Sequence, residues 1–82
     1  MADNTTSVVT LKDLAIGDDA TVVGFLDKAP SRRLLEMGFV PGTVVTALRS
    51  APLGDPIEYA VMGGRVAMRR IDALAILVEP RS

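Results

Sequence analysis

Few side chains in this chain of 82 residues are of the types that perform chemistry. The sequence has no histidine, no cysteine and a single tyrosine, so it lacks both an imidazole base and a thiolate nucleophile. Carboxylates occur close together at Asp18-Asp19 and at Asp55 and Glu58. Asp18-Asp19 directly follow a turn glycine, where carboxylates usually lie in solvent at the start of a strand. We therefore expect no catalytic residues and no enzyme activity.

The sequence also offers no clear ligand set for a metal, a cofactor or a nucleotide. Without imidazole or thiolate, the remaining donors are carboxylates, carbonyls and thioethers. Met37, Met62 and Met68 are soft donors, but their apolar neighbours favour a role in core packing. Gly38 and Gly42 are four residues apart but lack the Lys-Ser/Thr pair that completes a phosphate-binding loop. We expect no metal and no cofactor in the monomer, and leave open weak metal binding at an oligomer interface.

The charge pattern argues against a nucleic-acid partner. The net charge is −1, and acidic and basic residues are spread along the chain. Two basic pairs, Arg32-Arg33 and Arg69-Arg70, have no interleaved aromatic residues that would stack on bases. We expect these arginines to be solvated or to pair with Glu36 and Asp72.

Composition bears on location as well. The absence of cysteine fits a reducing compartment. Residues 1–7 are polar and lack the basic and apolar regions of a secretory signal, so we expect a disordered N-terminus and a cytoplasmic protein. The longest apolar run, residues 73–78, is far shorter than the roughly 20 residues that cross a bilayer. Any membrane connection is therefore expected to be indirect, through a partner.

The stretch 31–56 carries most of the structural signals. Ser31 is a suitable N-cap for a helix over residues 32–37, and Gly38 is a suitable residue to end it. Pro41-Gly42 predicts a turn, followed by a β-branched strand over residues 43–49.

The remaining segments alternate between short strands and turns. We expect a helical turn over 11–14 and strands over 19–26, 57–62, 66–68 and 73–79. Asp55 precedes Pro56 and is biased toward an extended backbone, and Gly63-Gly64 predict a two-residue hairpin turn. On strand 19–26 we expect Ala20, Val22 and Leu26 on one face. Five short strands with small helices predict a mainly β protein, a small, partly closed antiparallel barrel.

One group of apolar residues exceeds what a two-turn helix needs for its own packing. It comprises Leu34, Leu35, Met37 and Phe39, together with Leu53 in the loop that also holds Pro52 and Gly54. We predict that these residues bind a partner, and that Leu35, Phe39 and Leu53 line a hydrophobic cleft between the helix and the barrel.

The run LLEMGFVPGT at residues 34–43, followed by APLGDP at residues 51–56, resembles the FeoA family, the ferrous iron transport protein A domain. The resemblance extends over residues 11–79. It implies an SH3-like barrel with two or three short helices, occupying residues 8–80 as a single domain. It also implies an accessory protein of ferrous iron uptake that has no chemistry of its own and binds the cytoplasmic GTP-binding region of the membrane transporter FeoB.

Two alternatives stay open at this point. An SH3-like domain similar to FeoA also forms the C-terminal domain of iron-dependent transcriptional repressors, which suggests a self-associating regulatory module. This sequence, however, shows no DNA-reading helix. The second alternative is a homo-oligomer built through exposed strand edges, which is compatible with binding to FeoB.

Overall fold

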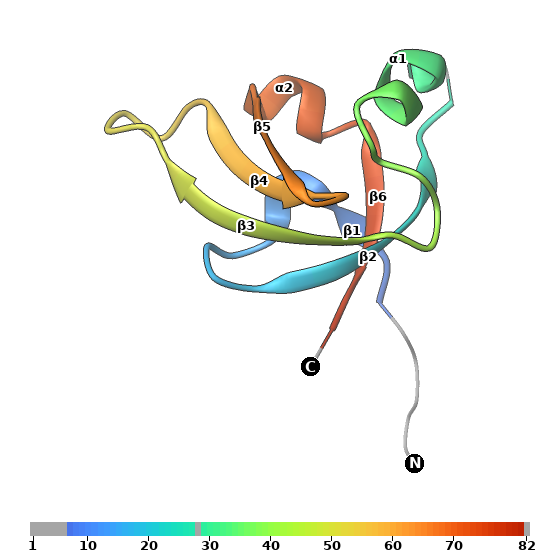
Figure 1. Cartoon of the computed structure of the whole chain (residues 1–82), viewed down its shortest axis with the longest axis horizontal. Coiled ribbons are helices and arrows are strands. Elements are labelled where there is room, and N and C mark those ends of the chain that lie inside the picture. The colour runs from blue at the N-terminus through green and yellow to red at the C-terminus, as the bar shows by residue number, and fades with distance from the viewer. Residues whose placement is uncertain (1–6, 28, 82) are drawn as a thin grey trace.

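Residues 7–27 and 29–81 are described by a computed structural model, in which six strands form one antiparallel sheet (Figure 1). The strands are β1 (Val9–Thr10), β2 (Asp19–Phe25), β3 (Val44–Ser50), β4 (Ile57–Val61), β5 (Gly64–Met68) and β6 (Ile76–Pro80). The helices are the 3₁₀ turn η1 (Leu11–Asp13), α1 (Ser31–Glu36) and α2 (Arg70–Ala73). The strand order is β1-β6-β2-β3-β4-β5. The predicted mainly antiparallel architecture with short helices is confirmed, and β1 is a sixth strand that the sequence did not predict.

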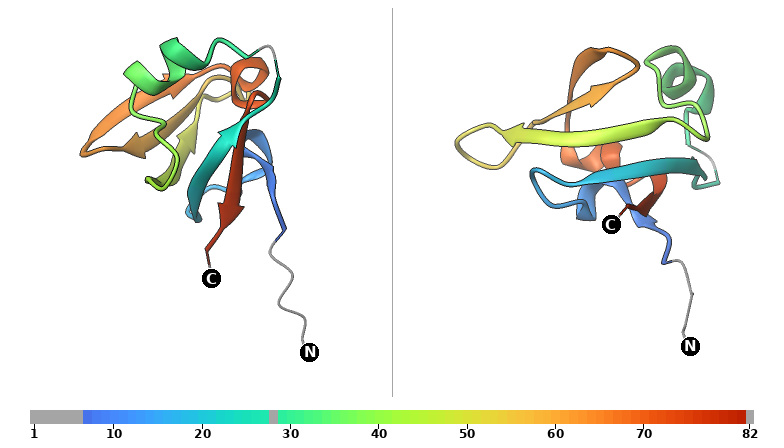
Figure 2. Two further views of the ribbon diagram at one scale, coloured as in Figure 1. Left: turned by 90° about the vertical axis from the view of Figure 1, so that its right-hand side faces the viewer. Right: turned by 60° about the horizontal axis from the view of Figure 1, so that its bottom comes forward.

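The sheet curls around a single hydrophobic core. Figure 2 shows β3, β4 and β5 on one side and β1, β2 and β6 on the other, with the two helices together at one end. Side chains alternate on β4, where Ile57, Tyr59 and Val61 are buried. The remaining core residues are Leu11, Leu14, Ala20, Val22, Leu34, Phe39, Val45, Ala47, Met68, Ala73, Ile76 and Val78.

A bulge in β2 changes which of its residues face the core. Val22 pairs with Val78 on β6 but Gly24 pairs with Leu77, so Val23 is an extra residue. A bulge of this kind reverses the alternation beyond it. Phe25 consequently packs against the core, and Leu26 is exposed. The prediction that Leu26 shares a face with Ala20 and Val22 is therefore wrong.

The N-terminus of α1 differs from the prediction. The helix begins at Ser31 itself, and Pro30 occupies the N-cap position with no side-chain cap. The Pro30 carbonyl accepts from the Leu34 N–H at 3.2 Å. The helix therefore starts one residue earlier than expected, and Ser31 lies in its first turn and does not cap it.

The C-terminus of α1 ends as predicted, at Gly38, whose φ is +108°. The Gly38 N–H donates to the Leu35 carbonyl at 3.0 Å, and the Phe39 N–H donates to the Leu34 carbonyl at 3.1 Å. This pair of bonds is the Schellman arrangement, which is accompanied by an apolar contact between the two ends of the motif. Here those two residues, Leu34 and Phe39, are both buried in the core.

Of two further predicted turns, one forms as expected and the other is shifted by one residue. Pro41-Gly42 forms the expected turn, closed by a 2.9 Å bond from the Thr43 N–H to the Val40 carbonyl. The β4–β5 hairpin instead turns at Met62-Gly63, both with positive φ, and not at Gly63-Gly64.

The Met62 side chain accounts for the shifted turn. It lies against Gly38, and its sulfur is 3.7 Å from the Thr43 hydroxyl. These contacts offset the cost of a left-handed backbone at a non-glycine residue.

The last segment contains more helix than predicted. Ala73, expected to begin the closing strand, is a buried residue of α2, and β6 begins only at Ile76. The predicted disorder of residues 1–7 concerns residues outside the described range, except for Ser7.

Tyr59 is the one aromatic core residue that carries a polar group. Its hydroxyl donates to the Leu11 carbonyl at 3.4 Å. Burial raises the pKa of Tyr59 to about 12, and the positive charge of Arg70 acts in the opposite direction. At neutral pH the side chain is an uncharged phenol.

We predict that replacing Gly38 by alanine destabilises the fold. The added Cβ would lie 3.1 Å from the Met62 Cγ, and the alanine backbone would have to keep a φ of +108°. We expect the free energy of unfolding to fall by on the order of 1–2 kcal/mol. Gly24→Ala is the matched control, since Gly24 has no positive φ and no atom within 4 Å of the added Cβ. Urea unfolding measures both, and equal losses would contradict the prediction.

We also predict a loss of stability at alkaline pH that depends on Tyr59. Below pH 10 the phenol is protonated in both states, so it adds no pH dependence. Between pH 10 and about 12 the unfolded state releases its proton first, so the free energy of unfolding falls as the pH rises. Tyr59→Phe should remove this component, as measured by urea unfolding across that range. Because Tyr59 is the sole tyrosine, phenolate absorbance gives its pKa directly, and a value near 10 would contradict the assignment.

Candidate functional site: a groove between the two helices

An open groove of about 400 Å³ lies between α1 and α2. One wall is formed by Pro30, Leu34 and Met37, from α1 and the residues that flank it. The facing wall comes from Ile71 on α2 and from Leu74 just after it. The walls belong to segments more than thirty residues apart in the chain, and the curl of the sheet brings them together at one end (Figure 2).

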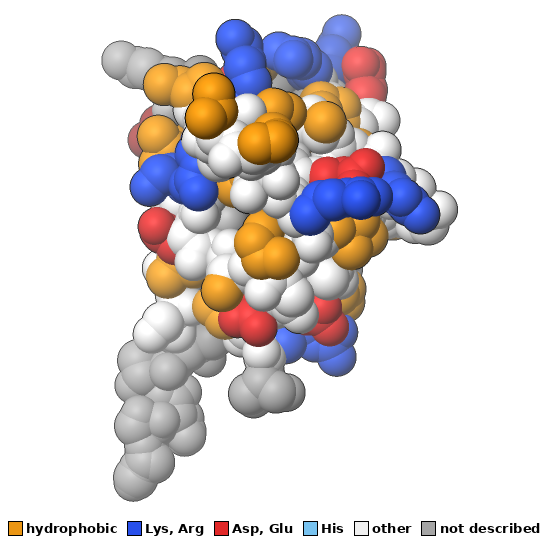
Figure 3. Space-filling model, turned by 90° about the vertical axis from the view of Figure 1, so that its left-hand side faces the viewer, with side chains coloured by type: hydrophobic (Ala, Val, Ile, Leu, Met, Phe, Trp, Pro, Cys, Tyr) orange, Lys and Arg blue, Asp and Glu red, His pale blue; other side chains and the backbone are white. Residues whose placement is uncertain are grey.

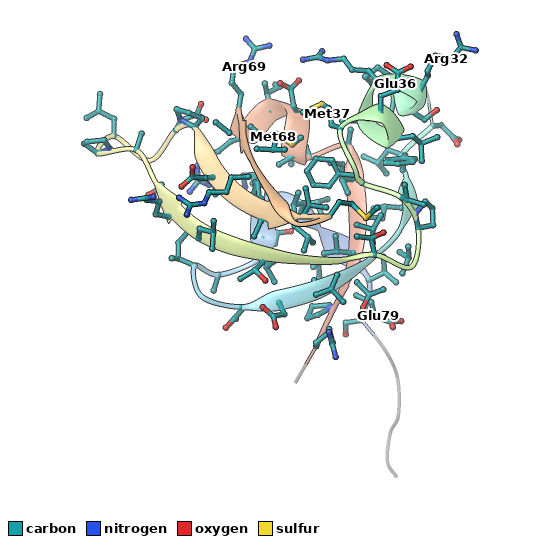
Figure 4. The ribbon with its side chains drawn as sticks, viewed as in Figure 1. Arg32, Glu36, Met37, Met68, Arg69 and Glu79 are labelled. Carbon is teal, nitrogen blue, oxygen red and sulfur yellow. The ribbon has the colours of Figure 1, made fainter. Side chains whose placement is uncertain are left out.

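Two methionines lie in this region between the helices. Figure 4 shows Met37 beside α1 and Met68 at the end of β5, whereas Arg32 and Glu36 point outward from α1. Met68 is almost completely buried and Met37 is half-buried. Methionine has a flexible side chain that fills irregular gaps between packed elements.

Charged residues stand at the rim of the groove. Arg33 and Arg69 contribute positive charge, and Asp27 and Asp72 contribute negative charge. The Arg69 Nε donates to the Asp72 Oδ2 at 3.3 Å, so the expected pairing of this arginine pair with Asp72 is confirmed. Within the described part of the chain, no ion pair joins Glu36 to an arginine, although the sequence suggested one.

The structure divides the predicted partner-binding residues into three groups. Leu34 and Met37 line the groove. Phe39 is fully buried in the core and cannot contact a partner, while Leu35 is 41% exposed but lies outside the groove lining. Pro52, Leu53 and Gly54 lie in the β3–β4 loop, at the opposite end of the molecule from α1 (Figure 1). The prediction of one cleft lined by Leu35, Phe39 and Leu53 is therefore wrong.

Sequence reasoning missed the second wall of the groove. The sequence predicts a strand over residues 73–79, which places Leu74 in the sheet and Ile71 in the turn before it. The spacing of Ile71 and Leu74 was the available signal for a helix, because residues three apart share one face of a helix. Ile71 is 67% exposed, so its apolar side chain is open to contact.

The β3–β4 loop forms a second exposed feature. Leu53 at its tip is 97% exposed. The loop is nevertheless held in place, because the Arg70 Nε donates to the Gly54 carbonyl at 2.8 Å. The Arg70 backbone N–H also donates to the Asp55 Oδ1 at 2.9 Å, so this carboxylate satisfies a free amide at the start of α2. The face that carries this loop has hydrophobic side chains interspersed with charges of both signs (Figure 3).

The described residues contain little that resembles a reactive centre. They include no group of three or more His, Cys, Asp or Glu side chains placed to hold a metal ion. None of the helices in the described part is long and apolar enough to cross a membrane. The lining of the groove is largely apolar, and its carboxylates are those of Asp27 and Asp72.

Comparison with known proteins agrees with this picture. The family model for the FeoA domain matches residues 9–80. A relative from Porphyromonas gingivalis, an Fe(2+) transport protein A/Fe(2+) transporter FeoB fusion protein, is 44% identical over 70 residues. The match covers 84% of this chain and 8% of that protein, so the chain spans a small part of its relative's length.

Solved structures support the same fold. FeoA of Stenotrophomonas maltophilia complexed with zinc, described as a procaryotic SH3 domain protein, superposes with a TM-score of 0.75 at 32% identity, covering 85% of this chain and 88% of that one. A manganese-dependent transcriptional repressor in complex with manganese superposes at 0.81 but with 23% identity, covering 95% of this chain and 39% of the repressor. This second likeness shows the fold alone. The predicted SH3-like barrel is confirmed, and because the family model matches most of its length, the chain belongs to the FeoA family.

Proposed function

We propose that this protein is a small cytoplasmic accessory protein of ferrous iron uptake that binds the cytoplasmic GTP-binding region of a FeoB-type transporter. The name of the relative from Porphyromonas gingivalis states that Fe(2+) transport protein A and the Fe(2+) transporter FeoB are fused in one chain. This fusion supports FeoB as the partner. The observation that carries the binding role is the apolar groove between α1 and α2.

The groove has the properties of a protein-binding site. Leu26, Ile71 and Leu74 line it and are exposed, which is unusual for three large apolar residues around one cavity. Burying an aliphatic side chain of this size contributes about 1.5–3 kcal/mol. The paired charges at the rim suit the polar border that surrounds an apolar contact.

The mechanism we propose is a change in the partner's conformational equilibrium. The described residues offer no catalytic constellation, so any effect on transport comes from binding energy. A bound protein shifts a two-state equilibrium only by the difference in its affinity for the two states. The affinity of this protein for FeoB should therefore depend on the nucleotide that FeoB holds.

Self-association is a second candidate function, supported by the β3–β4 loop. Leu53 is almost fully exposed on a loop that hydrogen bonds hold in place, which suits insertion into another protein or another copy. Measuring the protein's size across a range of concentrations tests this candidate. A monomer at every concentration would count against it.

The first test is a binding titration with the soluble GTP-binding domain of FeoB from the same organism. It is carried out with GDP and with a non-hydrolysable GTP analogue. We expect measurable binding whose affinity differs between the two nucleotides. If the domain binds in neither state, it is not the partner.

We predict that Ile71→Gln weakens this binding by about tenfold, equivalent to about 1.4 kcal/mol, because an apolar contact is replaced by a polar one. The substitution should leave the fold intact, since Ile71 is 67% exposed. Leu53→Gln is the matched control, with the same type of change outside the groove, and should retain binding. The reverse pattern would move the contact to the β3–β4 loop and contradict the proposal for the groove.

A further inference from the structure

The free edge of β5 presents backbone groups that β4 does not use. β5 is the last strand in the sheet order and, among the described residues, pairs only with β4. The two-residue turn at Met62-Gly63 brings Val61 opposite Gly64, and in such a hairpin this pair exchanges both of its backbone hydrogen bonds. Bonding then alternates along the strand, so the N–H and C=O groups of Arg65 and Ala67 point away from β4. Both residues are exposed.

This edge runs into the groove. Ala67, Met68 and Arg69 lie in the groove lining at the end of β5. Met37 of α1 also lines it, and Figure 4 shows Met37 and Met68 in the same region between the helices. The Ala67 side chain is a single methyl group, which leaves room for another backbone to approach the edge.

We infer that the groove receives an extended segment of the partner, which adds to the edge of β5 as a further strand. Hydrogen bonds to Arg65 and Ala67 would hold the segment's backbone, and alternate apolar side chains would enter the groove. A helical partner segment has its own backbone groups bonded internally and cannot satisfy this edge. The identity of the partner rests on the function proposed above, whereas the mode of binding rests on β5.

Charge favours a foreign segment over a second copy of β5. Arg65 is the one charged residue of β5, and among the described residues no ion pair joins it to a carboxylate. Arg69, which follows the strand, is already paired with Asp72. A second copy of β5 would add another Arg65 and no acidic residue. An apolar segment that carries an acidic residue opposite Arg65 would complement the edge.

The test compares Ala67→Pro with Ala67→Ser in the titration with the FeoB GTP-binding domain. Proline removes the outward N–H of Ala67 without removing a bond to β4, and sheets tolerate proline at such edge positions. Serine keeps the N–H and adds only a hydroxyl. We expect at least a tenfold loss of affinity for Ala67→Pro and a clearly smaller loss for Ala67→Ser, and equal losses would contradict the role of the N–H.

Amide hydrogen exchange of the wild-type protein gives a second measurement that does not depend on the proline variant folding. On addition of the FeoB domain, exchange at Arg65 and Ala67 should slow at least tenfold, while the amide of Leu53 in the β3–β4 loop should be unaffected. Slowing that appears without the FeoB domain and grows with protein concentration would make a second copy the occupant and overturn the inference.

The outcomes separate the two proposals. If the wild type binds but Ala67→Pro binds equally well and exchange at Arg65 and Ala67 is unchanged, strand addition is wrong and the proposed function stands. If the wild type does not bind the FeoB domain, the proposed function fails and the inference falls with it.

Discussion

The burial of Phe39 is the contact on which the arrangement of this molecule most depends. Phe39 is fully buried and directly follows Gly38, whose left-handed backbone turns the chain from the end of α1 into the core. Its N–H bonds the Leu34 carbonyl, and both side chains belong to the core. One short motif therefore fixes the end of α1, the direction of the following loop and the position of the helix on the barrel. A six-residue helix has little stability of its own, so this packing is what holds it.

The groove follows from that placement. With α1 fixed over one end of the barrel and α2 between β5 and β6, the space between the two helices is bordered by apolar side chains, some of them buried in the core and some exposed. The lining combines parts of α1, the end of β5 and α2, so no continuous stretch of sequence describes it. The groove thus lies at the junction of the helices, beside a core to which the strands, η1, α1 and α2 all contribute side chains.

The sequence predicted local features well and long-range placement poorly. Gly38 and Pro41-Gly42 were correctly assigned because each has one backbone requirement that few residues meet. The turn at Met62-Gly63 was displaced by one residue because Met62 is supported by contacts with Gly38 and Thr43, which are distant in sequence. The bulge at Val23 could not be predicted from the local sequence either, because it is defined by pairing with β6, which is distant in sequence.

The candidate site was predicted only in part, for the same physical reason. Leu34 and Met37 were found from the excess of apolar residues around α1, but whether Phe39 and Leu53 join them depends on how the chain folds back on itself. For Ile71 the only signal was its spacing from Leu74, which gains meaning once α2 is known to be a helix beside the groove.

Arg70 connects the two exposed features of the molecule, the groove and the β3–β4 loop. Its side chain and its backbone N–H hold the β3–β4 loop, and its own position is the first residue of α2, the helix that forms one wall of the groove. Any displacement of α2 must therefore carry the tip of the loop with it or break both bonds. Arg70 thus ties the β3–β4 loop to the start of the helix that forms one wall of the groove.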